Sequence, residues 1–96
     1  MEKLDPKMAD QFYSAILSLE TKEECRAFLA DICTIKEVQD LLQRLEVASM
    51  LTKGMNYQEI SSKTSVSSAT ISRVNRCLNY GDGGYNIVLG RLENNE

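Results

Sequence analysis

The sequence predicts an all-α protein, and three observations support this prediction. Apolar residues recur at helical spacing along most of the chain. Three segments, starting at Thr21, Thr34 and Asn56, have the capping-box pattern, in which an N-cap side chain precedes a glutamate by three residues. Each such helix start contributes about 1 kcal/mol. No segment shows the apolar–polar alternation that is typical of a half-buried strand.

Three helices are predicted in the first half of the chain. The first two have apolar faces formed by Met8, Phe12, Ala15, Ile16 and Leu19, and by Cys25, Phe28, Leu29 and Ile32. The third is longer and stops at Gly54, a residue suited to the position after a helix end. Its apolar face holds Ile35, Val38, Leu41, Leu42, Leu45, Ala48 and Leu51.

Two short helices, at about 57–63 and 67–79, are predicted to form a helix-turn-helix. The break falls at Thr64-Ser65, and Gly81 ends the second helix. The positions expected to hold the pair together are apolar: Ile60, Val66, Ile71 and Val74. A sixth helix follows, with Tyr85, Val88, Leu89 and Leu92 at helical spacing. We therefore expect one helical domain over residues 1–96, with dimerisation helices at 1–54 and 83–94 and the helix-turn-helix at 56–80.

The charge distribution and the short apolar runs limit the classes of function that the chain can have. The net charge is −3, but residues 49–80 hold Lys53, Lys63, Arg73 and Arg76 against Glu59 alone, so this segment is locally basic. The longest apolar run is four residues, which predicts no membrane span and no export signal. A cytoplasmic location is the expectation.

Enzymatic and metal chemistry have little support. The chain has no histidine and no glycine-rich phosphate loop. Its three cysteines lack the close paired spacing of a zinc site, and we expect them to be small buried apolar residues. We predict no enzyme activity, no metal and no cofactor.

The outer face of the helix-turn-helix favours DNA binding. A helix that enters the major groove needs short side chains near its N-terminus and cations further along, for phosphates. The residues that the apolar pattern leaves for this face are Gln58, Ser67, Ser68, Ala69, Ser72, Arg73 and Arg76. The alternative is an ordinary helical hairpin with a serine-rich surface.

From Asp31 to Gly81 the chain resembles the tryptophan-repressor family, particularly its YerC/YecD-type branch. The resemblance rests on the segments QRLEVA, SSATISRV and RCLNYG. It implies six helices per subunit, an intertwined homodimer, and two helix-turn-helix heads that reach successive major grooves of double-stranded DNA.

The resemblance also assigns roles to individual residues. Base-reading positions fall on Gln58, Ser61, Ser68, Ala69 and Ser72, with Thr70 toward a phosphate. Together with the cations Lys53, Lys63, Arg73 and Arg76, with Ser67, and with Tyr57, which either reaches a phosphate or packs at the helix entry, they form the predicted DNA-binding set.

The family's tryptophan site falls on Thr34, Arg44, Arg73, Val74 and Cys77. The family has a glycine where this chain has Val74 and a serine where it has Cys77, and valine fills the space that the indole needs. We expect a vestigial effector site that does not respond to tryptophan. The prediction is therefore a homodimeric, repressor-like regulator of transcription whose effector, if it has one, is unknown. The alternative is a dimeric protein-interaction module that keeps the fold without binding DNA.

Overall fold

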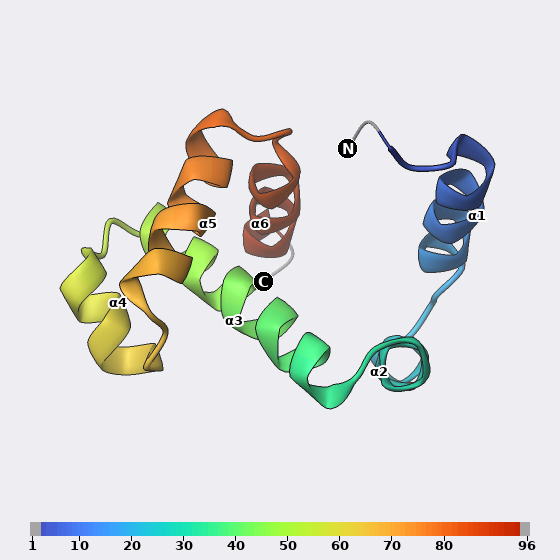
Figure 1. Ribbon diagram of the computed structural model, residues 1–96, viewed down its shortest axis with the longest axis horizontal. Coiled ribbons are helices and arrows are strands. Elements are labelled where there is room, and N and C mark those ends of the chain that lie inside the picture. Colours follow the sequence, from blue (N-terminus) through green and yellow to red (C-terminus); the bar gives the residue numbers. More distant parts are fainter. Residues whose placement is uncertain (1–2, 95–96) are drawn as a thin grey trace. The chain divides into compact units, whose positions relative to one another are not determined.

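The computed structural model describes residues 3–94, and this part of the chain is helical throughout apart from short connections (Figure 1). The all-α prediction is confirmed. The helices are α1 (Pro6–Leu17), α2 (Lys22–Ile32), α3 (Ile35–Thr52), α4 (Tyr57–Thr64), α5 (Ser68–Tyr80) and α6 (Gly84–Asn94).

Side-chain caps determine where five of these helices, α1 to α5, begin. At Thr34 the backbone N–H donates to Glu37 at 2.8 Å, and the Glu37 N–H donates to the Thr34 hydroxyl at 3.1 Å, which completes a capping box. Asn56 and Glu59 form the same reciprocal pair ahead of α4. Thr21 also caps α2, but the Glu24 carboxylate accepts from the Glu20 N–H. In α2 the N–H that donates to the glutamate therefore belongs to the residue before the N-cap, whereas the pattern predicts the N–H of the N-cap residue itself.

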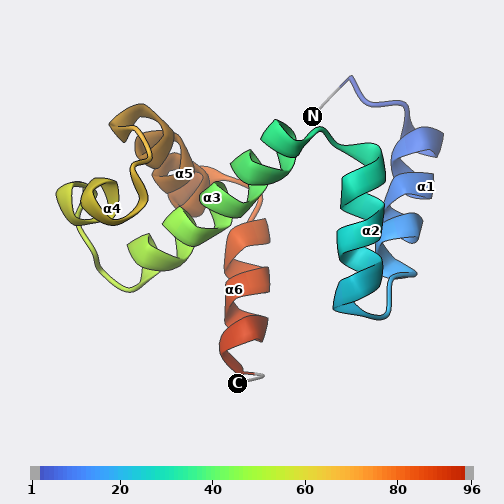
Figure 2. The same cartoon turned by 90° about the horizontal axis from the view of Figure 1, so that it is seen from below.

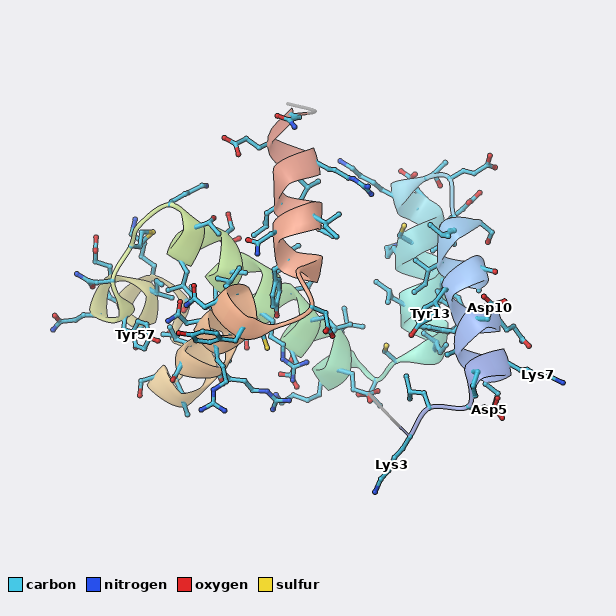
Figure 3. All side chains as sticks on the ribbon, turned by 90° about the horizontal axis from the view of Figure 1, so that it is seen from above. Lys3, Asp5, Lys7, Asp10, Tyr13 and Tyr57 are labelled. Atoms are coloured by element: carbon cyan, nitrogen blue, oxygen red, sulfur yellow. The ribbon has the colours of Figure 1, made fainter. Side chains whose placement is uncertain are left out.

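The first helix ends before the last residue of its predicted apolar face. The Asp5 carboxylate accepts from the N–H groups of Lys7 and Met8, and Pro6 occupies the first helical position, where its missing N–H costs nothing (Figure 3). The helix ends at Leu17, so Leu19 lies beyond it rather than on its apolar face. This cap has no glutamate three residues later, so the capping-box pattern could not reveal it.

Two glycines are required by the geometry of the chain. Gly54 has a φ of +86°, a conformation that other L-residues rarely adopt, and it turns the chain after α3. Gly81 follows α5 with an ordinary negative φ, but a Cβ there would lie 2.5 Å from the Cys77 carbonyl oxygen. Close packing of the backbone, rather than a positive φ, therefore excludes a side chain at Gly81.

The chain divides into two compact units, residues 1–38 and 39–96. In the first unit α1 and α2 lie side by side (Figure 2). The ring centroids of Phe12 and Phe28 are 6.0 Å apart. Neither helix contains a buried residue. An open groove of about 260 Å³ runs along this apolar face, lined by Met8, Gln11, Phe12, Ala15, Phe28 and Ile32.

The second unit contains the core, which is formed by α4, α5 and the C-terminal part of α3. The four residues predicted to join the helix-turn-helix are all buried, Ile60 and Ile71 completely. The apolar face predicted for α3 omits Val47, which has no exposed surface, while Leu41 and Leu42 of that face are 44% and 64% exposed within one chain. The complete core consists of Val47, Ala48, Ile60, Val66, Ile71 and Val74. Among residues 3–94, no helix is long and apolar enough to cross a membrane.

Candidate nucleic-acid interface and a neighbouring cavity

The turn between α4 and α5 is held by Thr64 and Ser65. Ser65 has a φ of +62°, which reverses the chain direction at the end of α4, and its N–H donates to the Ser61 carbonyl. The Thr64 hydroxyl donates to the Ile60 carbonyl at 2.7 Å and accepts from the Val66 N–H at 3.2 Å. Val66 is 5% exposed and anchors this turn to the core. The angle between the two helices is thus fixed by local hydrogen bonds as well as by packing.

Helix α5 begins on a polar, open surface. The Ser67 hydroxyl accepts from the Thr70 N–H at 3.2 Å and lies 3.2 Å from the Thr70 hydroxyl, to which it donates. In the first turn of a helix the N–H groups have no acceptor within the helix, so those of Ser68 and Ala69 are available to an external group. Such N–H groups, together with the helix dipole, favour an anion such as phosphate.

The predicted DNA-binding residues all lie in the second unit, and nearly all are exposed. Thr70 is the exception, because it is half-buried and hydrogen-bonded to Ser67. Tyr57 is the first residue of α4 (Figure 3), and its side chain is 37% exposed. The exposed residues are Lys53, Tyr57, Gln58, Ser61, Lys63, Ser67, Ser68, Ala69, Ser72, Arg73 and Arg76.

Next to this surface, residues of α3, α5 and α6 line a small open cavity of about 160 Å³. It brings together four of the five residues that the resemblance assigns to an effector site. The fifth, Thr34, belongs to the other compact unit. Sequence reasoning missed two lining residues, Thr70 and Tyr85. The lining consists of Arg44, Thr70, Arg73, Val74, Cys77 and Tyr85.

Val74 and Cys77 differ in this cavity. Val74 is 2% exposed and is a core residue as well as a wall of the cavity, as the spacing predicts. Cys77 is exposed within the single chain, as is Cys25, so the prediction of buried cysteines is wrong for both. Because α5 has polar and charged residues on more than one side, the apolar pattern alone could not show whether Cys77 is buried or exposed.

Tyr85 is the aromatic residue of the cavity. Burial raises the pKa of its hydroxyl above 10.0, Cys77 acts in the same direction, and the guanidinium groups of Arg44 and Arg73 oppose the shift. The hydroxyl is therefore within electrostatic reach of both arginines and stays protonated at neutral pH. Tyr85 also packs against the core, so it contacts both the apolar and the charged surroundings.

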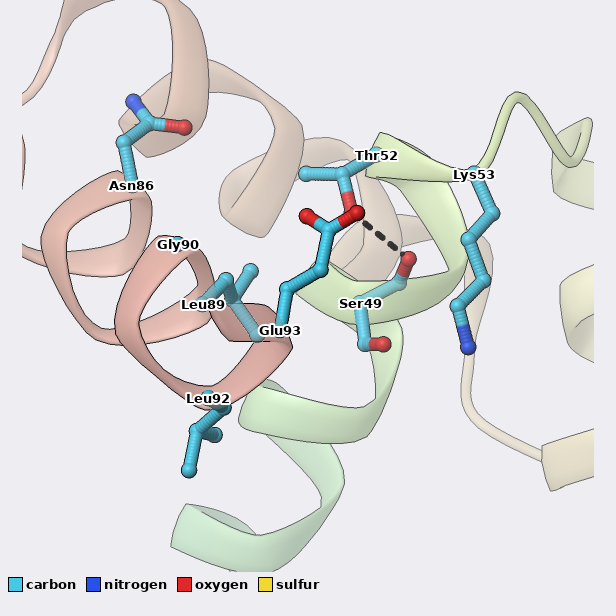
Figure 4. Close-up of a pocket in the computed structure, with 8 residues that line it drawn as sticks. All are labelled: Ser49, Thr52, Lys53, Asn86, Leu89, Gly90, Leu92 and Glu93. Atoms are coloured by element: carbon cyan, nitrogen blue, oxygen red, sulfur yellow. Dashed lines mark hydrogen bonds between the residues drawn. The ribbon is translucent and has the colours of Figure 1, made fainter. Parts of the chain in front are cut away.

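A second, larger groove of about 510 Å³ lies between the end of α3 and α6 (Figure 4). Leu89 and Leu92 contribute apolar surface, and Lys53, one of the predicted phosphate contacts, is among the lining residues. The Thr52 hydroxyl donates to the Ser49 carbonyl at 2.8 Å, which satisfies this polar group at the end of α3. Across residues 3–94 no three cysteine, aspartate or glutamate side chains are grouped as metal ligands would be.

Comparisons with known proteins agree on one family. A sequence model described as Trp repressor protein matches residues 7–93. The uncharacterized protein YerC of Bacillus subtilis (strain 168) is 51% identical over 96 residues, covering all of this chain and 92% of YerC.

Two solved structures share the six-helix fold. A protein from Staphylococcus aureus with a provisional Trp repressor assignment is 44% identical with a TM-score of 0.91, covering 96% of this chain and 92% of that one. A TrpR-like protein from Eubacterium eligens ATCC 27750 is 48% identical with a TM-score of 0.92, covering 97% and 96%. The match to the family model spans both compact units and all six helices, so the chain belongs to the Trp repressor family.

Proposed function

We propose that the protein is a sequence-specific DNA-binding regulator of transcription that acts as a homodimer through α4 and α5. The observation that carries this proposal is the division of α5 into two faces. Ile71 and Val74 are buried against the core, while Ser68, Ser72 and Arg73 are exposed on the same helix. A recognition helix needs this division, because it must pack on its own domain and still contact base edges.

The two kinds of exposed residue suit two kinds of contact. Short side chains at the start of α5, such as Ser68 and Ala69, let the helix approach base edges directly or through ordered water. The cations Arg73 and Arg76, together with Lys63 at the end of α4, supply phosphate contacts that set position and affinity. Membership of the Trp repressor family supports this assignment.

A homodimer follows from the apolar surface that one chain leaves uncovered. Among residues 3–38 none is buried, and the groove in this unit exposes Met8 and Phe12. In the second unit Leu42 and Val88 are also exposed. Uncovered apolar surface on a small chain marks an interaction site, and the family resemblance implies that a second copy of this chain fills it.

The overall net charge of −3 favours one alternative, a dimeric protein-interaction module that has kept the fold but not DNA binding. The salt dependence of binding to duplex DNA distinguishes the two functions. A DNA reader binds non-specific duplex at low salt, with an affinity that falls steeply as salt rises, whereas an interaction module does not. Selection of bound duplexes from a random library then identifies the preferred sequence.

Replacing Arg73 or Arg76 by alanine is expected to weaken binding to all duplexes alike. Each lost phosphate contact should flatten the plot of log affinity against log salt by about one unit. The control is Arg26→Ala, because Arg26 is an exposed arginine on α2, outside the helix-turn-helix. Titration of each variant against a specific and a scrambled duplex at several salt concentrations measures both effects.

A bulky residue at Ser72 is expected instead to change which sequence is preferred while leaving the salt slope unchanged. Arginine variants that retain full affinity and the wild-type slope would remove Arg73 and Arg76 from the phosphate contacts.

Free L-tryptophan is expected to leave DNA affinity unchanged. Val74 is a buried core residue, and forcing additional volume into a filled site costs about 1–3 kcal/mol even when the site adapts. The cavity beside Val74 has a volume of about 160 Å³. An engineered cavity of roughly 150 Å³ in another protein holds a single benzene ring. Calorimetry on the free protein gives the test: tryptophan binding at micromolar concentration would show that the steric argument about Val74 is wrong.

A further inference from the structure

The start of α6 is tied to α5 at two adjacent residues. Only residues 81–83 separate the two helices, so α6 begins directly beside the end of α5. The Asn86 amide donates to the Leu78 carbonyl at 3.3 Å. Its neighbour Tyr85 packs against the core and lines the cavity whose other wall is α5. The first turn of α6 therefore lies against α5 on the side that carries the cavity-lining residues Arg73, Val74 and Cys77.

Tyr85 is well suited to hold α5 in place. An aromatic ring gives a large contact area at a small entropy cost, and its hydroxyl can remain in a polar setting while the ring packs on apolar groups. Here the ring belongs to the partly buried layer around the core, and Tyr85 lines the same cavity as Arg44 and Arg73. Arg73 is also a proposed phosphate contact. One side chain thus links α6 and α3 to the residue that meets DNA.

We propose that Tyr85 is a positioning residue that holds α5 and Arg73 in the DNA-binding orientation. This inference rests on the proposed function, because it explains how the recognition helix is kept ready. The cavity geometry carries it: Tyr85 lines the space between Arg44 and Arg73, together with the buried Val74.

The test compares Tyr85→Ala with Tyr85→Phe and with a matched control, Tyr80→Ala. Tyr80 is the last residue of α5 and is 86% exposed, so its removal changes tyrosine content without opening the cavity. Each variant is measured for DNA affinity and for amide hydrogen exchange, with and without 4-methylphenol, which has the shape of the deleted side chain. A cavity of this kind can take up a small aromatic compound from solution.

The expected results separate a positioning role from general stability. If Tyr85→Ala leaves one molecule in ten with α5 correctly placed, DNA affinity falls about tenfold. Amide exchange should accelerate in residues 68–76 but not in α1 or α2. 4-Methylphenol should restore affinity and protection in Tyr85→Ala while leaving the wild type and Tyr80→Ala unchanged. Tyr85→Phe, which keeps the ring, should retain most of the affinity.

Failure of this inference can be distinguished from failure of the proposed function. If the wild type binds no DNA, hydrogen exchange still shows whether Tyr85 and 4-methylphenol control the order of α5. If Tyr85→Ala does not fold, Tyr85→Leu, which keeps an apolar contact with the core, takes its place in the same comparison. Wild-type exchange in α5 for the folded variant, or a loss that 4-methylphenol does not reverse, would overturn the positioning role.

Discussion

Replacing Leu42 by glutamate is expected to dissociate the homodimer. Leu42 is 64% exposed within one chain, so the change should cost the folded protomer little. If a second copy covers this side chain, the variant loses about 1.5–3 kcal/mol of apolar burial in each protomer. The two copies together lose roughly 3–6 kcal/mol, which weakens association by about a hundredfold to ten-thousandfold.

The matched control is Gln43→Glu, which places the same charge at the neighbouring, exposed polar position of α3. Sedimentation over a range of protein concentrations compares the two variants with the wild type. We expect a dimer for the wild type and for Gln43→Glu, with unfolding that depends on protein concentration. A folded 10.8 kDa wild-type monomer at micromolar concentration would contradict the dimer.

Replacing Ile71 by alanine is expected to destabilise the helix-turn-helix most strongly among substitutions on α5. Ile71 has no exposed surface and lies where α5 meets the core, so deleting its methyl groups leaves a cavity and costs about 2–5 kcal/mol. Stability of small domains is only about 5–15 kcal/mol, so much of it would be lost.

Ser72→Ala, on the exposed side of the same helix, should change the free energy of unfolding by no more than about 0.5 kcal/mol. Denaturant titrations at matched protein concentration provide the comparison. Equal effects of the two substitutions would mean that α5 does not pack as the structure indicates.

The fold could be predicted in large part from the sequence, because the signals for a helix, apolar spacing and caps, lie within short segments of the chain. The buried set Ile60, Val66, Ile71 and Val74 is confirmed, and so are helix starts at Thr34 and Asn56. The apolar pattern could not show which residues of α3 are buried within the chain and which are exposed. Its apolar residues serve two surfaces, one packed on the same chain at Val47 and one left exposed at Leu42, and helical spacing alone does not distinguish them.

The site was less predictable, because it depends on contacts between distant segments. Spacing placed Ser68, Ser72 and Arg73 on the outside of α5, where the structure also has them. Tyr85 was assigned to an apolar dimerisation face, yet it lines the cavity with Arg44 and Arg73. In the sequence, α4 and α5 lie between Arg44 on α3 and Tyr85 on α6. The packing of α6 on α5 brings these two residues into one cavity.

The central claim is that the dimer binds double-stranded DNA through α4 and α5. The most direct measurement is the affinity for a DNA duplex as a function of salt. If Lys53, Lys63, Arg73 and Arg76 of both protomers contact phosphates, the slope of log affinity against log salt should be roughly −7, from about −0.9 per contact. Double substitution of Arg73 and Arg76 by alanine should make the slope markedly shallower. No binding to duplex DNA at low salt, or a slope near zero, would contradict the claim and favour the protein-interaction module.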